Sequence, residues 1–89
     1  MTEIQVWPVD PRDQRWEVWS PRFRVSFWRL TVDGWASREF ELAATDVVAV
    51  LEWVKEHAEP RETSAVYCVV DGSDGRGLVR LAGNDPTRT

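Results

Sequence analysis

The sequence predicts an α+β fold in which a small antiparallel β-sheet of four to six strands packs against a single α-helix. Three observations predict this class. Apolar and polar residues alternate over residues 22–32, as in a strand with one buried face. Residues 45–58 repeat their apolar positions at helical spacing, and residues 63–70 are almost wholly apolar. The expected order along the chain is β-β-β-β-α-β-β.

Length and composition are those of one folded domain. With 89 residues, 43% of them hydrophobic and 29% charged, the chain is too apolar for intrinsic disorder and too short for two domains. We therefore expect a single compact domain over residues 1–89. Residues 83–89 are polar, contain a proline and are expected to form a frayed tail.

Two short strands are expected near the N-terminus. Residues 4–7 have β character up to Pro8, which cannot donate a ladder hydrogen bond. Residues 16–19 form a second short β segment, which ends before Pro21. These two segments contain three of the six tryptophans of the chain.

A β-hairpin is the clearest local feature. The strand over 22–32 and the strand over 35–42 flank an Asp33-Gly34 pair, which is typical of a two-residue type I′ turn. Counting outward from that turn gives the register. Val32 is expected opposite Trp35, Leu30 opposite Ser37, Trp28 opposite Glu39, Phe27 opposite Phe40, and Val25 opposite Leu42.

This register gives the hairpin two different faces, because side chains alternate across a sheet. One face carries Val25, Phe27, Phe40 and Leu42 and is expected to be core. The other is apolar near the turn and polar further away. Its apolar residues are Trp28, Leu30, Val32 and Trp35, and its polar ones are Ser26, Ser37, Glu39 and Glu41.

The helix is expected to begin at Thr45 as N-cap and to run to Ala58, before Pro60. A stripe of apolar residues should face the Phe27 and Phe40 side of the sheet. Its members are Val47, Val50, Leu51, Val54 and Ala58. Trp53 and His57 are expected on a flank of the helix, one turn apart.

The C-terminal part of the chain should form a second hairpin. Residues 63–70 predict a central strand covered on both faces, because almost every position is apolar. A glycine-rich loop over 71–77 then leads into a last strand over 78–82.

Charge and cysteine content restrict the classes of partner. A net charge of −4 disfavours direct nucleic-acid binding, which requires clustered lysine and arginine. A single cysteine, Cys68, excludes an intrachain disulfide and fits a reducing compartment. No signal-peptide pattern is present, and the longest apolar run, 65–70, is too short to span a bilayer. We expect a cytoplasmic protein with no membrane association.

The sequence offers little for catalysis, so we predict that the protein is not an enzyme. His57 is the only histidine, and Cys68 lies in an apolar strand where its thiol would be inert. One histidine and one cysteine cannot fill a zinc site. The loop 71–77 lacks the ligand pattern of an EF-hand and the Gly-Lys-Ser/Thr of a phosphate loop. We expect no catalytic residue, metal or cofactor.

The aromatic face formed by Trp28, Leu30, Val32 and Trp35 is the strongest functional signal, because monomeric proteins seldom leave such a patch bare. The N-terminal tryptophans could cover it as a second layer. The functional alternative is a protein partner or a second copy of the chain. The candidate interface residues are then the aromatic face itself with Arg24, Arg29, Arg38, Trp53 and His57.

The predicted function is therefore a non-catalytic protein-protein interaction or regulatory module. Two alternatives stay open. One is a small-ligand-binding protein with a tryptophan-lined site. The other is an acidic inhibitor that mimics nucleic acid, although a net charge of −4 is modest for that role.

Overall fold

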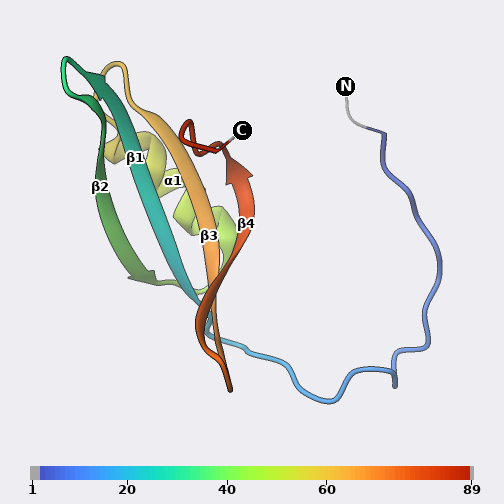
Figure 1. Ribbon diagram of the computed structural model, residues 1–89. Helices are drawn as coiled ribbons and strands as arrows, with labels where there is room; N and C mark the ends of the chain where they lie inside the picture. The colour runs from blue at the N-terminus through green and yellow to red at the C-terminus, as the bar shows by residue number, and fades with distance from the viewer. Residues whose placement is uncertain (1–2, 89) are drawn as a thin grey trace.

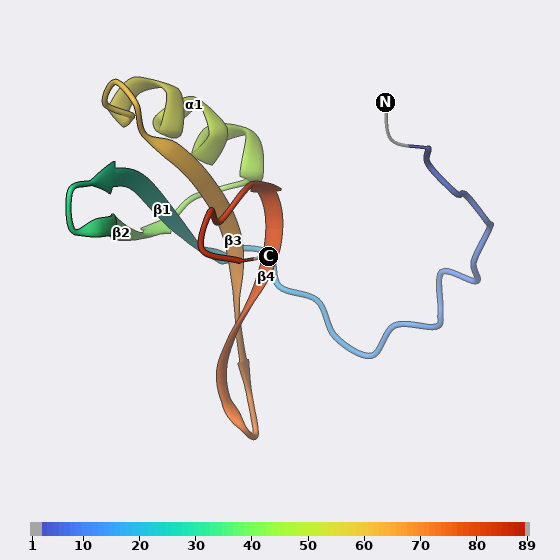
Figure 2. The ribbon, with the colours of Figure 1, turned by 45° about the horizontal axis from the view of Figure 1, so that its top comes forward.

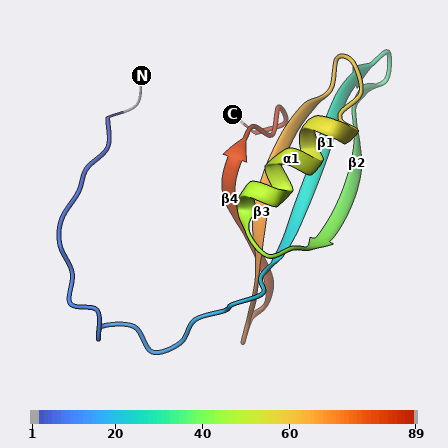
Figure 3. The same ribbon diagram turned by 180° about the vertical axis from the view of Figure 1, so that it is seen from behind.

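A computed structural model describes residues 3–88 and shows a four-stranded antiparallel sheet with one helix across one face (Figure 1, Figure 3). The strand order in the sheet is β2-β1-β3-β4, so two hairpins lie side by side with β1 against β3. The predicted α+β class is confirmed, with the order β-β-α-β-β. The elements are β1 (Arg22–Thr31), β2 (Gly34–Ala43), α1 (Val47–His57), β3 (Thr63–Gly72) and β4 (Gly75–Gly83).

The two short N-terminal strands predicted over 4–7 and 16–19 are wrong. Residues 3–20 have no strand pairing and contain a turn at 10–13, and most of this segment stands away from the sheet (Figure 1, Figure 2). The segment 4–7 ends at Pro8, which cannot donate a ladder hydrogen bond, and neither four-residue segment pairs with the sheet of its own chain. We call residues 3–20 the arm.

The first hairpin turns one residue earlier than predicted. Thr31 pairs with Gly34 and Leu30 pairs with Trp35, so Val32 and Asp33 occupy the turn. A type I′ turn needs positive φ at both central residues. Here Gly34 adopts positive φ, 113°, whereas Asp33 does not. The Thr31 hydroxyl accepts a bond from the Asp33 N–H and donates to the Gly34 carbonyl.

Every predicted pair in this hairpin is therefore shifted by two residues. Val25 pairs with Phe40 instead of Leu42, and Trp28 pairs with Ser37 instead of Glu39. Because side chains alternate with a period of two, a shift by two leaves each residue on its predicted face. The register was wrong, whereas the division into two faces is correct.

The second hairpin follows the prediction with longer strands. β3 extends to Gly72 and β4 begins at Gly75, so most of the predicted loop over 71–77 belongs to the ladder. β3 lies between β1 and β4, which confirms its central position. Its burial on both faces is confined to Ala65 and Val66, while the remaining apolar side chains are half-buried.

The helix begins one residue later than predicted. Asp46, rather than Thr45, is the N-cap, since its Oδ1 accepts a hydrogen bond from the Ala49 N–H at 3.0 Å. The helix ends at His57, before Pro60, and the Ala58 N–H donates to the Val54 carbonyl. Within residues 3–88, no helix has the length and apolar character needed to cross a membrane.

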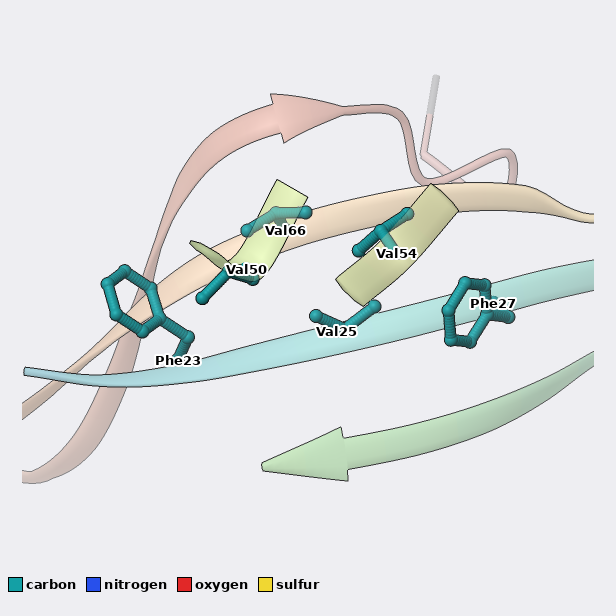
Figure 4. Packing of buried hydrophobic residues seen from close by; sticks show 6 residues of the cluster. All are labelled: Phe23, Val25, Phe27, Val50, Val54 and Val66. Carbon is teal, nitrogen blue, oxygen red and sulfur yellow. The ribbon is translucent and has the colours of Figure 1, made fainter. Parts of the chain in front are cut away.

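The core lies between α1 and the face of the sheet that carries the odd-numbered residues of β1. Figure 4 shows these side chains, which are Phe23, Val25, Phe27, Val50, Val54 and Val66. The predicted helical stripe is correct at Val50 and Val54 but wrong at Leu51 and Ala58, which are exposed. Trp53 packs against the core in their place, because the helix is rotated toward β2.

Candidate functional site

The face of the sheet opposite α1, which we call the open face, is apolar at the end near the first turn. Leu30 and Trp35 stand directly opposite each other there and are 63% and 43% exposed. Val32, in the turn itself, is fully exposed. The arm does not cover these residues, so the alternative of an N-terminal second layer is wrong (Figure 1). Leu30, Val32 and Trp35 therefore form an exposed apolar surface at this end of the sheet, which we call the apolar tip.

Trp28 lies two residues further along the open face and is half-buried. Its indole Nε1 is buried and has no hydrogen-bond partner among residues 3–88. A buried N–H without a partner costs about 1–3 kcal/mol, because it has lost its bond to water and gained nothing. The Trp28 side chain is thus held in place by packing and not by its polar atom.

A hollow of about 620 Å³ adjoins Trp28 on the open face. It is polar and mixed in charge, and the Ser26 hydroxyl donates to Glu39 Oε1 at 2.7 Å on one wall. Tyr67 of β3 also lines the hollow, and burial raises the pKa of its phenol above the ordinary value of 10.0. The lining residues are Ser26, Trp28, Glu39, Tyr67, Leu78, Arg80, Asn84, Asp85 and Arg88.

The C-terminal residues 84–88 form one side of this hollow. The Asn84 N–H donates to the Ser64 carbonyl at 3.0 Å, which anchors the segment to β3. Asp85 accepts hydrogen bonds from Thr87, and these bonds lower the pKa of the Asp85 carboxyl. Gly83 permits the close approach, since it has positive φ and an added Cβ would overlap the Ser64 carbonyl oxygen.

Arg24 also lies on the open face, but at its polar end. Its guanidinium is 3.8 Å from Glu41, which Arg22 and Arg76 approach more closely, at 3.2 and 2.7 Å. Arg24 is six residues away from Leu30 along an extended strand, roughly 20 Å. The structure therefore does not bring Arg24 to the rim of the apolar tip.

Arg29 and Arg38 lie on the other face of the sheet, the one that carries α1, because they alternate with Trp28 and Ser37. Arg38 forms a paired contact with Glu62, with Nε to Oε2 at 2.9 Å and Nη2 to Oε1 at 2.7 Å. This bond lowers the pKa of the Glu62 carboxyl. Arg38 thus has a structural partner, whereas Arg29 is exposed.

Trp53 and His57 complete the group on the helix side. Their rings stack with centroids 4.3 Å apart, and His57 Nδ1 lies 2.8 Å from the Trp53 carbonyl oxygen. Trp53 in turn contacts the Phe27 and Phe40 rings, with centroids 5.9 and 5.4 Å away. The nine candidate residues therefore divide into two groups separated by the sheet. Trp28, Leu30, Val32, Trp35 and Arg24 belong to the open-face side, and Arg29, Arg38, Trp53 and His57 belong to the helix side.

The arm is a second exposed apolar surface. The sequence predicted two short strands there and not an exposed segment. Trp16 and Trp19 are 72% and 83% exposed, and Ile4, Val6, Trp7, Val9 and Val18 are also exposed. A signal was present in Pro8 and Pro11, which interrupt a ladder over the first part of the arm. The Arg12–Asp10 pair lies within the arm, whereas Trp16 and Val18 line a hollow of about 740 Å³ together with Cys68–Asp71 of β3.

Comparison with known proteins identifies no relative: no family model, curated protein or solved structure matches the chain.

Proposed function

We propose that this chain is a non-catalytic protein-binding module whose partner docks on the aromatic face. The exposed Leu30–Trp35 pair, extended by Val32 in the turn, is the observation that carries the proposal. Burying these three side chains would remove apolar surface from water, and tryptophan is enriched among residues that dominate binding energy. A cytoplasmic partner is expected, given the single Cys68.

The surroundings of the tip support a protein partner. The centre of a protein interface is typically apolar and its rim polar. Here the apolar tip passes through half-buried Trp28 into the polar hollow beside Glu39 and Tyr67. If a partner covers the apolar tip, the polar rim of its interface would contact these polar groups.

The test compares Trp35→Ala with Val48→Ala in tagged protein purified gently from its host and measured by native mass spectrometry. Val48 is an exposed apolar residue on α1, so it serves as the matched control. We expect the wild type and Val48→Ala to retain a bound protein that Trp35→Ala loses, with unchanged circular dichroism in all three. Equal retention by both variants would reject the aromatic face as the docking surface.

A small-ligand site is a second candidate, favoured by the hollow on the open face. Its volume of about 620 Å³ lies within the range of ligand pockets, and Tyr67 and Arg80 offer donors to an anionic or carbonyl group. The Trp28 indole N–H signal in a nitrogen-proton correlation spectrum would report binding of small carboxylates. Absence of any shift at millimolar ligand would remove this candidate.

No observation favours the nucleic-acid mimic. Such a mimic needs carboxylates presented freely to the target, whereas Glu41 on the open face is paired with Arg22, Arg24 and Arg76.

A further inference from the structure

The outer edge of β4 is an open β-sheet edge with apolar and cationic side chains. Its Leu78, Val79 and Leu81 are all exposed. β4 contains two arginines, Arg76 and Arg80, and no acidic residue. An edge of this kind can accept another extended strand, because its outward N–H and C=O groups lack ladder partners.

The arm has the complementary properties. It is already extended, it carries seven exposed large apolar side chains, and it contains four acidic but only two basic residues. The stretch between Pro11 and Pro21 is free of proline and contains Trp16, Glu17, Val18 and Trp19. This stretch can therefore pair along its whole length.

We propose that the arm of one molecule pairs as an additional antiparallel strand with the outer edge of β4 in a second copy of the chain. In one register of this pairing, the arm residues are chemically complementary to the β4 residues beside them on both faces of the sheet. It sets Glu17 beside Arg80 and Trp19 beside Leu78 on the open face. It also sets Val18 beside Val79 on the helix side and Trp16 beside Leu81.

The other edge strand, β2, fits the arm less well. It carries Glu39, which would repel Glu17, and its one arginine, Arg38, is already paired with Glu62. β4 presents Arg80 at the corresponding place. Charge thus selects β4 over β2.

The arm is too short to pair with the outer edge of β4 in its own chain, so the acceptor is a second molecule. In the sheet, Phe23 pairs with Cys68, and Val69 pairs with Leu78, so Arg22 is level with Leu78. A strand outside β4 is three strand spacings from β1, about 14 Å. Trp19 precedes Arg22 by three residues, which span at most about 11 Å. Trp19 therefore cannot lie opposite Leu78 of its own chain.

Reciprocal exchange of two arms gives a closed dimer, as expected for a symmetric pair. Each molecule contributes the nine arm residues between Pro11 and Pro21 together with the nine residues of β4 that receive the other arm. That total is comparable with the roughly 20–30 residues per side of a stable interface. The contact leaves Leu30 and Trp35 free, so it goes beyond the function proposed above and is independent of it.

Two chains, each with Cys68→Ser and one new cysteine, test the geometry. Val18→Cys is placed in one chain and Val79→Cys in the other, and the two proteins are mixed and oxidised. Residues opposite each other in adjacent strands have the spacing of a disulfide, so a mixed disulfide is expected. Val48→Cys on α1 is the control acceptor. Equal cross-linking to both acceptors, or none to Val79→Cys, would overturn the proposal.

A charge exchange tests the register in the full-length protein by sedimentation equilibrium. Glu17→Arg and Arg80→Glu should each weaken the dimer by about tenfold, because a symmetric dimer contains the pair twice. The double variant should restore it. Trp19→Ala should weaken it at least tenfold as well. Trp35→Ala is the control and should leave the dimer unchanged. A wild type that is monomeric at about 100 μM, or a dimer that Trp19→Ala leaves intact, would contradict arm exchange.

Discussion

Arg38 Nη2 lies 2.7 Å from Oε1 of Glu62, and this pair joins β2 to the loop between α1 and β3. The same Nη2 donates to the His57 carbonyl oxygen at 3.1 Å, at the C-terminal end of α1. The Arg38 guanidinium also lies over the Phe27 ring, 4.8 Å from its centroid. Since the Glu62 side chain is only 3% exposed, the two charges depend on each other.

Arg38→Ala should lower the free energy of unfolding by more than Arg29→Ala does, because it removes the paired hydrogen bonds to the Glu62 carboxylate. Urea denaturation measures this change. Arg29→Ala is the matched control, since Arg29 lies on the same face of the neighbouring strand but is exposed. A loss of equal size in both variants would mean that the pair has no special role.

Stability should fall in acid because of Glu62. Its bond to Arg38 lowers the pKa of the Glu62 carboxyl below the ordinary value of 4.5. A carboxyl with a lowered folded-state pKa stabilises the fold fully above its unfolded pKa. That contribution is then lost as the pH falls from 4.5 through the folded pKa. Denaturation curves between pH 7 and 3 should show a shallower decline for Glu62→Gln than for the wild type.

Tyr67 offers a direct probe of the hollow, because it is the only tyrosine of the chain. Burial first, and the nearby Asp85 charge second, raise the pKa of its phenol above 10.0. Absorbance titration of the phenolate should therefore give a midpoint above 10, and Asp85→Asn should lower that midpoint. An ordinary midpoint would show that the C-terminal segment does not cover Tyr67 in solution.

Trp28→Phe should change the free energy of unfolding by less than about 1 kcal/mol. The smaller ring loses some packing, but it also removes an indole N–H that is buried without a partner. Trp28→Ala removes the packing as well and should cost about 2–3 kcal/mol. If Trp28→Phe cost as much as Trp28→Ala, the N–H would have an important partner in solution.

Gly83→Ala should destabilise the fold by at least about 2 kcal/mol, since a Cβ there meets the Ser64 carbonyl and the backbone has positive φ. Gly77→Ala in the same strand is the control, because its added Cβ would find its nearest atom at 3.9 Å. This control should be neutral or slightly stabilising, by about 0.5 kcal/mol. Thermal melts of the two variants give the comparison.

Arg38 shows where prediction of the candidate site from sequence reached its limit. Its face of the sheet follows from alternation, but Glu62 is 24 residues away and meets it only through the path of α1 and its loop. Trp53 is a similar case, because the position of a residue on a helical wheel does not fix how the helix is rotated on the sheet. Its contacts with Phe27 and Phe40 depend on that rotation.

The sequence by itself determined the α+β class, the two hairpins, the helix and the face on which each strand residue lies. Those features depend on periodicity and turn residues within a few positions of each other. Only the tertiary structure decided the turn at Val32 and Asp33, the free arm, and the separation of Trp35 from Trp53 by the sheet. Each of these depends on which distant segments pack together, and local free energies of about 1 kcal/mol do not settle that choice.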